Sequence, residues 1–173
     1  LRPGDVVLGD IAHALAHVNR FAGHTCEPIS VAQHSVYCSW LVGGGPHGLQ
    51  ALLHDATEAY LGDVVKFLKA SPVMAGYREA EDAAWGVISA RFGVAERLAP
   101  TVVAADKTMV RYEGVMGYGP AGLPAPGYGP LPDEEMAELR LLLPDWRFWS
   151  PTGAKTQFLA RVAELTERRA EVA

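Results

Sequence analysis

Glycine and proline divide the chain into segments that read as helices, and this division leaves little room for any fold other than a helical one. Within the segments, apolar residues recur three and four positions apart, as on the buried face of an amphipathic helix. Ser30 opens one of them with a capping pattern, because its hydroxyl can accept from the backbone of Gln33 while the Gln33 side chain reaches back. No segment shows convincing strand alternation. We therefore predict an all-α protein, a helical bundle.

The start and stop signals give approximate helix boundaries. The expected helices cover residues 30–42, about 48–61 with Gly62 as the C-terminal cap, 71–92 before Gly93, about 99–114, 133–143 before Pro144, and a terminal helix that starts at Ser150 and Pro151, with a short turn or helix at 64–68. No run of charges forms a linker between them. We expect residues 1–173 to form a single domain.

Residues 114–132 interrupt the helical pattern. This segment holds six glycines and five prolines, and the quartet Gly-Tyr-Gly-Pro occurs in it twice. Neither a helix nor a central strand is expected at that density. The sequence predicts a long loop here, either a binding loop or a mobile connection, whose tyrosines stack on a base or anchor the loop.

Composition restricts the partners. The chain has 15 Lys and Arg against 20 Asp and Glu, a net charge of −5, which argues against a nucleic-acid polymer as the main partner. No apolar run approaches the roughly 20 residues that span a bilayer, so we expect no membrane partner and a cytoplasmic location. The two cysteines, Cys26 and Cys38, form no CxxC pair, and reduced thiols are expected.

Polar side chains stand on helix faces where apolar ones belong. All six histidines lie in the first third of the chain, and one of them, His34, shares a core-facing stripe with Val31 and Cys38. His54 and Asp55 interrupt a second apolar run. Asp106 has apolar neighbours three and four positions away on both sides. Three expected helices thus each turn an imidazole or a carboxylate inward.

A buried carboxylate is costly unless it is paired or binds a cation. Two imidazoles from His34 and His54 with two carboxylates from Asp55 and Asp106 suit one divalent transition metal, Zn, Mn, Fe, Co or Ni, with positions left for water and substrate. Taken singly, each residue has a simpler interpretation, because a lone inward His is often a hydrogen-bonded core residue and a lone Asp half of an ion pair. The combination of all four favours the metal site.

These residues resemble the H…HD…D signature of the HD-superfamily metal-dependent phosphohydrolases, which are all-helical. Residues 54–63, HDATEAYLGD, look like the HDAxE…GD segment of the 5′-deoxynucleotidase branch, and residues 19–21, Asn-Arg-Phe, are similar to its NRW segment. The sequence also resembles the phage dATP triphosphohydrolases. Matching positions run from about Ile11 to Asp106, and Phe21 departs from the family by replacing its Trp.

The resemblance implies catalytic roles. His34, His54, Asp55 and Asp106 would hold the metal, which polarises a phosphoryl oxygen and acidifies water. Glu58, one helical turn beyond the ligands, would orient or deprotonate the attacking water, although a solvated helix Glu is the simpler alternative. Asp63 would protonate the leaving group or bind the deoxyribose hydroxyl. The structural alternative is that it only caps the loop.

Four further residues are candidates for substrate binding. The planar fork of Arg20 suits phosphate oxygens, and Phe21 would stack on a base. Lys66, with Lys69 beyond it, would contact a polyphosphate chain, and His24 is a further candidate contact. A surface Arg, a core Phe and solvated lysines are the alternatives. The resemblance also allows a second divalent ion, Mg, with the substrate phosphates.

Three functions from two classes follow, and a purely structural helical domain is a further alternative. The first is a dNTP triphosphohydrolase, with dATP preferred, which would release deoxynucleoside and triphosphate. The second is a 5′-deoxynucleotidase that acts on dNMPs. The third is a non-catalytic nucleotide-binding module that keeps the metal for structure. In each case the partner is a small deoxynucleotide, and we expect a homo-oligomer because members of the resembled family usually associate.

Overall fold

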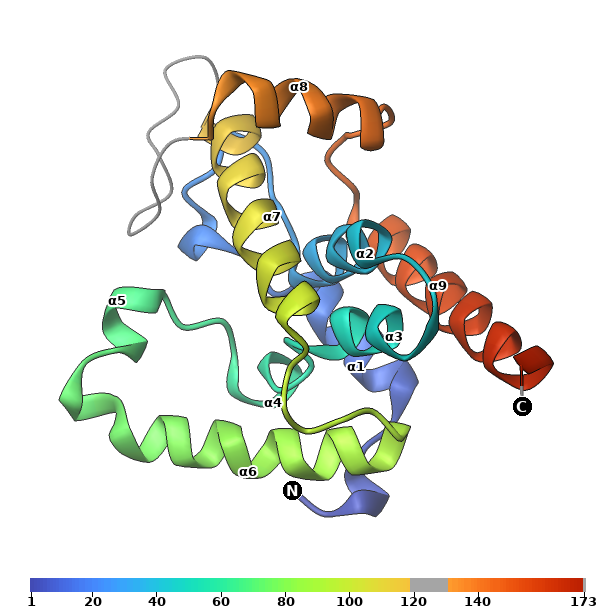
Figure 1. Cartoon of the computed structure of the whole chain (residues 1–173). Coiled ribbons are helices and arrows are strands. Elements are labelled where there is room, and N and C mark those ends of the chain that lie inside the picture. The colour runs from blue at the N-terminus through green and yellow to red at the C-terminus, as the bar shows by residue number, and fades with distance from the viewer. Residues whose placement is uncertain (119–130, 173) are drawn as a thin grey trace.

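The computed structural model describes residues 1–118 and 131–172, with side chains as far as residue 167, and this part of the chain is all-α (Figure 1). Its one β-bridge is isolated and joins Asn19 to Ser30. The helices are α1 (Leu8–His17), α2 (Val31–Val42), α3 (Gly45–Leu53), α4 (Glu58–Leu61), α5 (Lys66–Lys69), α6 (Ala75–Phe92), α7 (Pro100–Tyr118), α8 (Asp133–Leu142) and α9 (Pro151–Val172), with 3-10 turns at Pro3–Asp5, Phe21–Gly23 and Pro72–Met74.

Helix α2 lies at the centre of the bundle and packs against α1, α3, α7 and α9 (Figure 1). One side of the core joins α1, α2, α3 and α9, with Phe158 and Leu52 fully buried. The other side joins α2, α7 and α8 around Tyr37, Met109 and Tyr112. Because both faces of α2 are covered, nine consecutive residues at its start are buried, and polar side chains there must find partners inside the protein.

Several of the expected helix ends are confirmed. Ser30 caps α2, since its hydroxyl accepts from the backbone N–H of Gln33 at 3.2 Å. Gly43, Gly62 and Gly93 end their helices with φ of 91°, 79° and 63°, a region that glycine reaches without steric cost. The reciprocal half of the capping box is wrong, because the Gln33 side chain binds the backbone of residues 147 and 149 instead.

The expected continuous helix over 48–61 is also wrong. Helix α3 begins earlier, at Gly45, and ends at Leu53, and α4 begins only at Glu58. Between them the chain tightens into bonds of the i to i+3 type, such as Ala56 N to Leu53 O at 2.9 Å. His54 Nδ1 forms a hydrogen bond with the Ala51 carbonyl oxygen at 2.7 Å. In a regular helix this oxygen would accept from the backbone N–H four residues later.

Two helix starts differ slightly from expectation. Ser71 does not cap the long helix, because a 3-10 turn at Pro72–Met74 comes first and α6 begins at Ala75. Asp133 is the first residue of α8 and not its cap, a position held by Pro132.

The expected loop at about 114–132 begins too early. Helix α7 continues to Tyr118, so residues 114–118 are helical, and residues 119–130 lie outside the described residues. Glycine is needed here for packing, because a Cβ on Gly117 would lie 2.6 Å from Thr25 Cγ2 and 3.1 Å from Ile29 Cδ1. Close contact between α7 and the loop that carries Thr25 and Ile29 therefore outweighs the low helix propensity of glycine.

Gly48 provides a test of how tightly α2, α3 and α9 pack. A Cβ at this position would collide with the Gly43 carbonyl and lie 2.9 Å from Leu165 Cδ2, so Gly48→Ala should lower the free energy of unfolding by about 1–3 kcal/mol. Gly76→Ala in α6 is the matched control, because nothing lies within 4 Å of its Cβ and the change should be neutral or slightly stabilising. Urea denaturation of both variants checks this, and equal effects would contradict the packing described.

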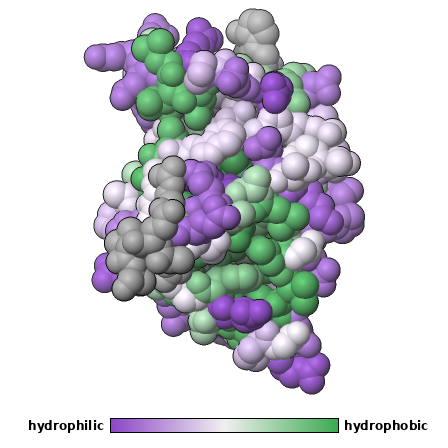
Figure 2. Space-filling view, turned by 90° about the vertical axis from the view of Figure 1, so that its right-hand side faces the viewer, coloured by the Kyte–Doolittle hydropathy of each residue, from purple (hydrophilic) through white to green (hydrophobic). Residues whose placement is uncertain are grey.

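No helix in the described ranges has both the length and the hydrophobicity needed to cross a bilayer. Apolar residues nevertheless reach the surface. On the face seen in Figure 2 they gather in a continuous area bordered by hydrophilic residues. Among the residues whose side chains are described, the most exposed large apolar ones are Phe67, Val73 and Leu141, which are 75%, 80% and 82% exposed.

Candidate metal centre

The four residues predicted to hold a metal lie together. His34 lies on α2, His54 and Asp55 follow α3, and Asp106 lies on α7, which packs against both. His34 Nε2 lies 3.3 Å from Asp106 Oδ1 and 3.7 Å from Asp55 Oδ2. His54 Nε2 lies 3.3 Å from Asp55 Oδ2 and 3.9 Å from Asp106 Oδ1. Two nitrogen and two oxygen donors from three segments thus face a common point.

The donors at this point fit a divalent cation. His54 Nε2 is buried and forms no hydrogen bond among the described residues, although it faces two carboxylate oxygens. A buried polar atom without a partner is rare, and an ion is one of its ordinary explanations. Imidazole nitrogen and carboxylate oxygen are suitable ligands for Zn, Mn, Fe, Co and Ni. The side chains of Asp55 and Asp106 are 21% and 32% exposed, so the point is reached from solvent.

The electrostatics of the group indicate an excess of negative charge. Burial opposes a charge on His34 and His54, yet Cys38 beside His34 and the neighbouring carboxylates together outweigh it and raise the pKa of both imidazoles. Burial likewise opposes a charge on Asp106, but the neighbouring imidazoles of His34 and His54 lower its pKa. A raised pKa favours the protonated imidazoles, whose positive charge offsets that of the carboxylates. A divalent ion would take over that balancing charge and release the protons.

Glu113 and Arg20 form a second layer behind this centre. The Glu113 side chain is fully buried on α7, and its two oxygens lie 3.0 and 3.1 Å from His34 Nδ1. Its Oε2 also accepts from Arg20 Nε at 3.0 Å, and Arg20 Nη1 reaches Asp55 Oδ2 at 3.4 Å. Burial opposes the Arg20 charge, but Glu113 and Asp55 raise its pKa. A bond to Nδ1 leaves the His34 Nε2 lone pair directed at the metal position.

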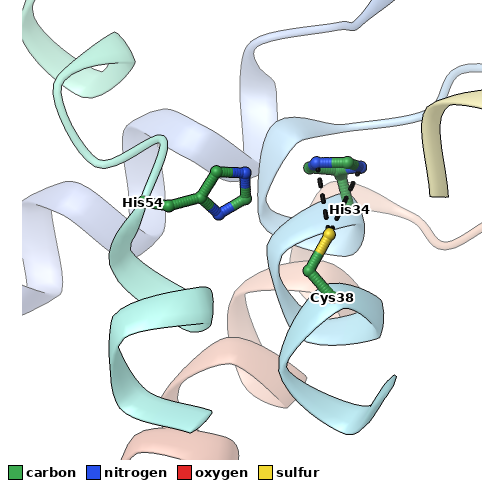
Figure 3. A group of neighbouring side chains, drawn as sticks. All are labelled: His34, Cys38 and His54. Carbon is green, nitrogen blue, oxygen red and sulfur yellow. Dashed lines mark hydrogen bonds between the residues drawn. The ribbon is translucent and has the colours of Figure 1, made fainter. Parts of the chain in front are cut away.

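Cys38 lies one turn beyond His34 on α2 and is fully buried. Its Sγ lies 3.4 Å from His34 Nε2, and Figure 3 shows the sulfur pointing toward the His34 ring while the His54 ring reaches toward the same space. One donor atom from each of His34, Cys38 and His54 lies within 4.8 Å of the others. Burial raises the pKa of Cys38 to about 11. The structure therefore places a sulfur atom beside the predicted ligands.

The two carboxylates predicted to be catalytic lie beside the centre. Glu58 opens α4 and is 5% exposed, and its Oε2 is buried without a hydrogen bond among the described residues. Burial, and then the charges of Asp55 and Asp63, raise the pKa of Glu58 well above its ordinary value. Burial also raises the pKa of Asp63. Glu58 is thus no solvated helix residue, and its neutral form is stabilised as in many sites of proton transfer.

A stability measurement tests the burial of Glu58. Its raised pKa means that the folded protein resists ionisation of this group, so the stability lost to it grows as pH rises above the ordinary value of 4.5. In metal-free protein near neutral pH, Glu58→Gln should therefore raise the free energy of unfolding by about 1 kcal/mol. Below the ordinary pKa the gain should vanish, because the unfolded chain is then also protonated. Urea denaturation across this range checks it, and a variant destabilised at neutral pH would contradict it.

A pocket of about 420 Å³ lies next to the second layer. All four residues predicted to bind substrate line it, and Asp63 does too: Arg20, Phe21, His24, Lys66 and Asp63. Tyr118, at the end of α7, forms another part of the wall and meets the Phe21 ring edge to face at 5.8 Å. Arg20 joins the two features, because it lines the pocket and also bonds to Asp55.

The loop at residues 20–24, which lines the pocket, is held in an unusual backbone conformation. Phe21 and Ala22 have φ of 55° and 50°, and Gly23 follows at 74°. Bulky residues rarely adopt such angles, and backbone strain of this kind concentrates at functional sites. The loop is fixed on one side by the bond from Arg20 N to Ile29 O at 2.9 Å.

Sequence reasoning missed Glu113 and Cys38. Cys38 stands in the same core-facing stripe as His34, and Glu113 follows Met109 and Tyr112 on α7. The signal that identified Asp106, a polar side chain on an apolar helix face, was available for both. Lys69, the further lysine candidate, lines the pocket but pairs with Glu81 at 2.6 Å.

No family model matches the chain. It is similar to the uncharacterized protein YfdR of Escherichia coli (strain K12), with 39% identity over 109 residues, 63% of this chain and 60% of that protein. It is also similar to the uncharacterized protein RCAP_rcc00048 of Rhodobacter capsulatus, with 38% identity over 123 residues, 64% of this chain and 62% of that protein. The chain thus spans less than two thirds of the length of these curated relatives.

Proposed function

We propose that the protein is a metal-dependent phosphohydrolase of 2′-deoxynucleotides, of the HD type that its motifs resemble. The observation that carries this proposal is the convergence of His34, His54, Asp55 and Asp106, with ligand atoms 3.3–3.9 Å apart. When bound, a divalent transition metal there supplies the positive charge that polarises a phosphoryl oxygen and acidifies water.

The chain's own residues would supply the remaining chemistry. Glu58 has a buried, unbonded carboxylate oxygen and a raised pKa, which suit it to take the proton of the attacking water. Asp63 also has a raised pKa and lines the pocket, where a protonated carboxyl group can pass a proton to the leaving deoxynucleoside oxygen. These proposed roles of Glu58 and Asp63 are the ones that the motif implies. The neighbouring pocket offers a place for the substrate on which they would act.

The pocket supports a nucleotide as the substrate class. Arg20, Lys66 and Lys69 bring positive charge to a wall that also carries the aromatic rings of Phe21 and Tyr118. Cations bind phosphate oxygens, and aromatic rings stack on bases. Its volume of about 420 Å³ lies within the range usual for small-ligand sites.

We favour a dNTP because three cationic side chains line the pocket, and dATP first because the sequence resembles the phage dATP triphosphohydrolases. One observation favours the 5′-deoxynucleotidase alternative. Arg20 is bonded to Glu113 and Asp55, and Lys69 to Glu81, so part of this positive charge is already balanced inside the chain. A monophosphate carries less negative charge than a triphosphate and would need fewer cationic side chains to bind it.

A substrate panel tests the proposal. The protein is incubated with dNTPs, dNMPs and the matching ribonucleotides in the presence of Mn²⁺ or Co²⁺, and the products are identified by mass. Release of deoxyadenosine and triphosphate from dATP supports the favoured form, whereas phosphate released only from dNMPs supports the nucleotidase. Binding of nucleotides without any product would overturn the enzyme and indicate a binding module.

A further inference from the structure

The position of Cys38 within the metal centre has no role in the proposed reaction. A cysteine this deeply buried can simply fill space, as a small apolar residue does. Here, however, its sulfur faces two imidazoles, one of which, His54, has a buried Nε2 without a hydrogen bond among the described residues. Two observations therefore point at the same space, the sulfur and the unpaired nitrogen.

The separation between Cys38 Sγ and His34 Nε2 is the one expected of two atoms that share an ion. With metal–nitrogen bonds of about 2.0–2.1 Å and metal–sulfur bonds of about 2.3 Å, two ligands at angles between octahedral and tetrahedral lie roughly 3.1–3.6 Å apart. Cys38 Sγ lies 3.4 Å from His34 Nε2. The carboxylate oxygens lie at similar separations, 3.3 and 3.7 Å from His34 Nε2 and 3.3 and 3.9 Å from His54 Nε2.

We propose that Cys38 is a further ligand of the metal centre, whose sulfur makes the site prefer Zn²⁺ or Co²⁺ to Mn²⁺. On coordination the S–H bond is replaced by a sulfur–metal bond, and the proton leaves to solvent. Thiolate is a soft ligand that selects Zn²⁺ over harder ions, whereas carboxylate and water suit Mn²⁺ and Mg²⁺. This inference rests on the proposed function for the existence of the centre, and it adds a determinant of which metal is bound.

Cobalt spectroscopy tests the inference without relying on activity. The metal-free full chain is titrated with Co²⁺, whose visible bands report binding and whose near-ultraviolet band reports charge transfer from a thiolate. Both bands are expected for the native protein. Cys38→Ser, and Cys38→Ala as a second variant in case Ser disturbs folding, should keep the visible bands and lose the near-ultraviolet one. Cys26→Ser is the matched control, because Cys26 is exposed, and it should keep both.

The outcomes separate the two proposals. Visible bands without a near-ultraviolet band in the native protein would overturn the role of Cys38 and leave the metal centre standing. No visible bands at all would contradict the centre and the role of Cys38 together. A competition titration provides the second readout, in which Cys38→Ala should reduce the preference for Zn²⁺ over Mn²⁺ by at least about tenfold. An unchanged preference would also overturn the inference.

Discussion

Asp106→Ala is expected to abolish the proposed phosphohydrolase turnover while leaving the protein folded. Asp106 provides a carboxylate oxygen 3.3 Å from His34 Nε2 and 3.9 Å from His54 Nε2, and it is the one predicted ligand from α7. A correctly placed metal contributes several kcal/mol to the transition state, so turnover should fall at least about a thousandfold. Initial rates on the best substrate, with circular dichroism for folding, measure this.

Asp82→Ala is the matched control for Asp106. Asp82 is an exposed carboxylate on α6, outside the metal centre and the pocket that Arg20 lines. Its loss should leave the rate within the error of the native value. A folded Asp106→Ala variant that retains turnover would show that the centre described is not where the reaction takes place.

Glu113→Gln is expected to raise the dissociation constant of the metal by about 10–100-fold. Gln keeps the shape of Glu113 but lacks its charge, and its amide can donate toward His34 Nδ1, which favours the tautomer with a protonated Nε2. The Glu113 oxygens lie 3.0 and 3.1 Å from that nitrogen, so the tautomer depends directly on this contact. Calorimetric titration of metal-free protein measures the change.

Glu135→Gln serves as the control for Glu113. Glu135 pairs with Arg111 at 3.1 Å, away from the metal ligands, and its neutralisation should leave metal affinity unchanged. Glu113→Ala should instead lower the free energy of unfolding by about 3–5 kcal/mol, because Arg20 and His34 lose a buried partner. An unchanged affinity in Glu113→Gln would remove Glu113 from the account of the centre.

The sequence was most informative where a local pattern determines the outcome. Helical periodicity predicted the all-α class, and glycine caps such as Gly43 and Gly93 marked true helix ends. The four predicted metal ligands could be grouped from the sequence because each interrupts an apolar run of an expected helix, and such apolar faces converge in a bundle. The structure brings these side chains together, with imidazole nitrogens as close as 3.3 Å to carboxylate oxygens, as that reasoning predicts.

Features that depend on tertiary contact could not be read from the sequence. Helix α7 extends to Tyr118 because Gly117 packs closely against Thr25, a neighbour that no local pattern reveals. At the break after Leu53, the His54 ring forms a hydrogen bond with the Ala51 carbonyl oxygen, a contact that no local pattern predicts. Glu113 can be assigned to His34 only when the spacing of α2 and α7 is known, since 79 residues separate them.

The most direct test of the account is the metal content of the protein. Metal-free native chain is titrated with Zn²⁺ and with Co²⁺ by calorimetry, beside the variant His54→Ala. We predict one ion bound per chain in the native protein and a large loss of affinity in the variant, because His54 Nε2 is one of the converging donors. Absence of binding by the native chain, or equal binding by the variant, would contradict a metal centre at this position.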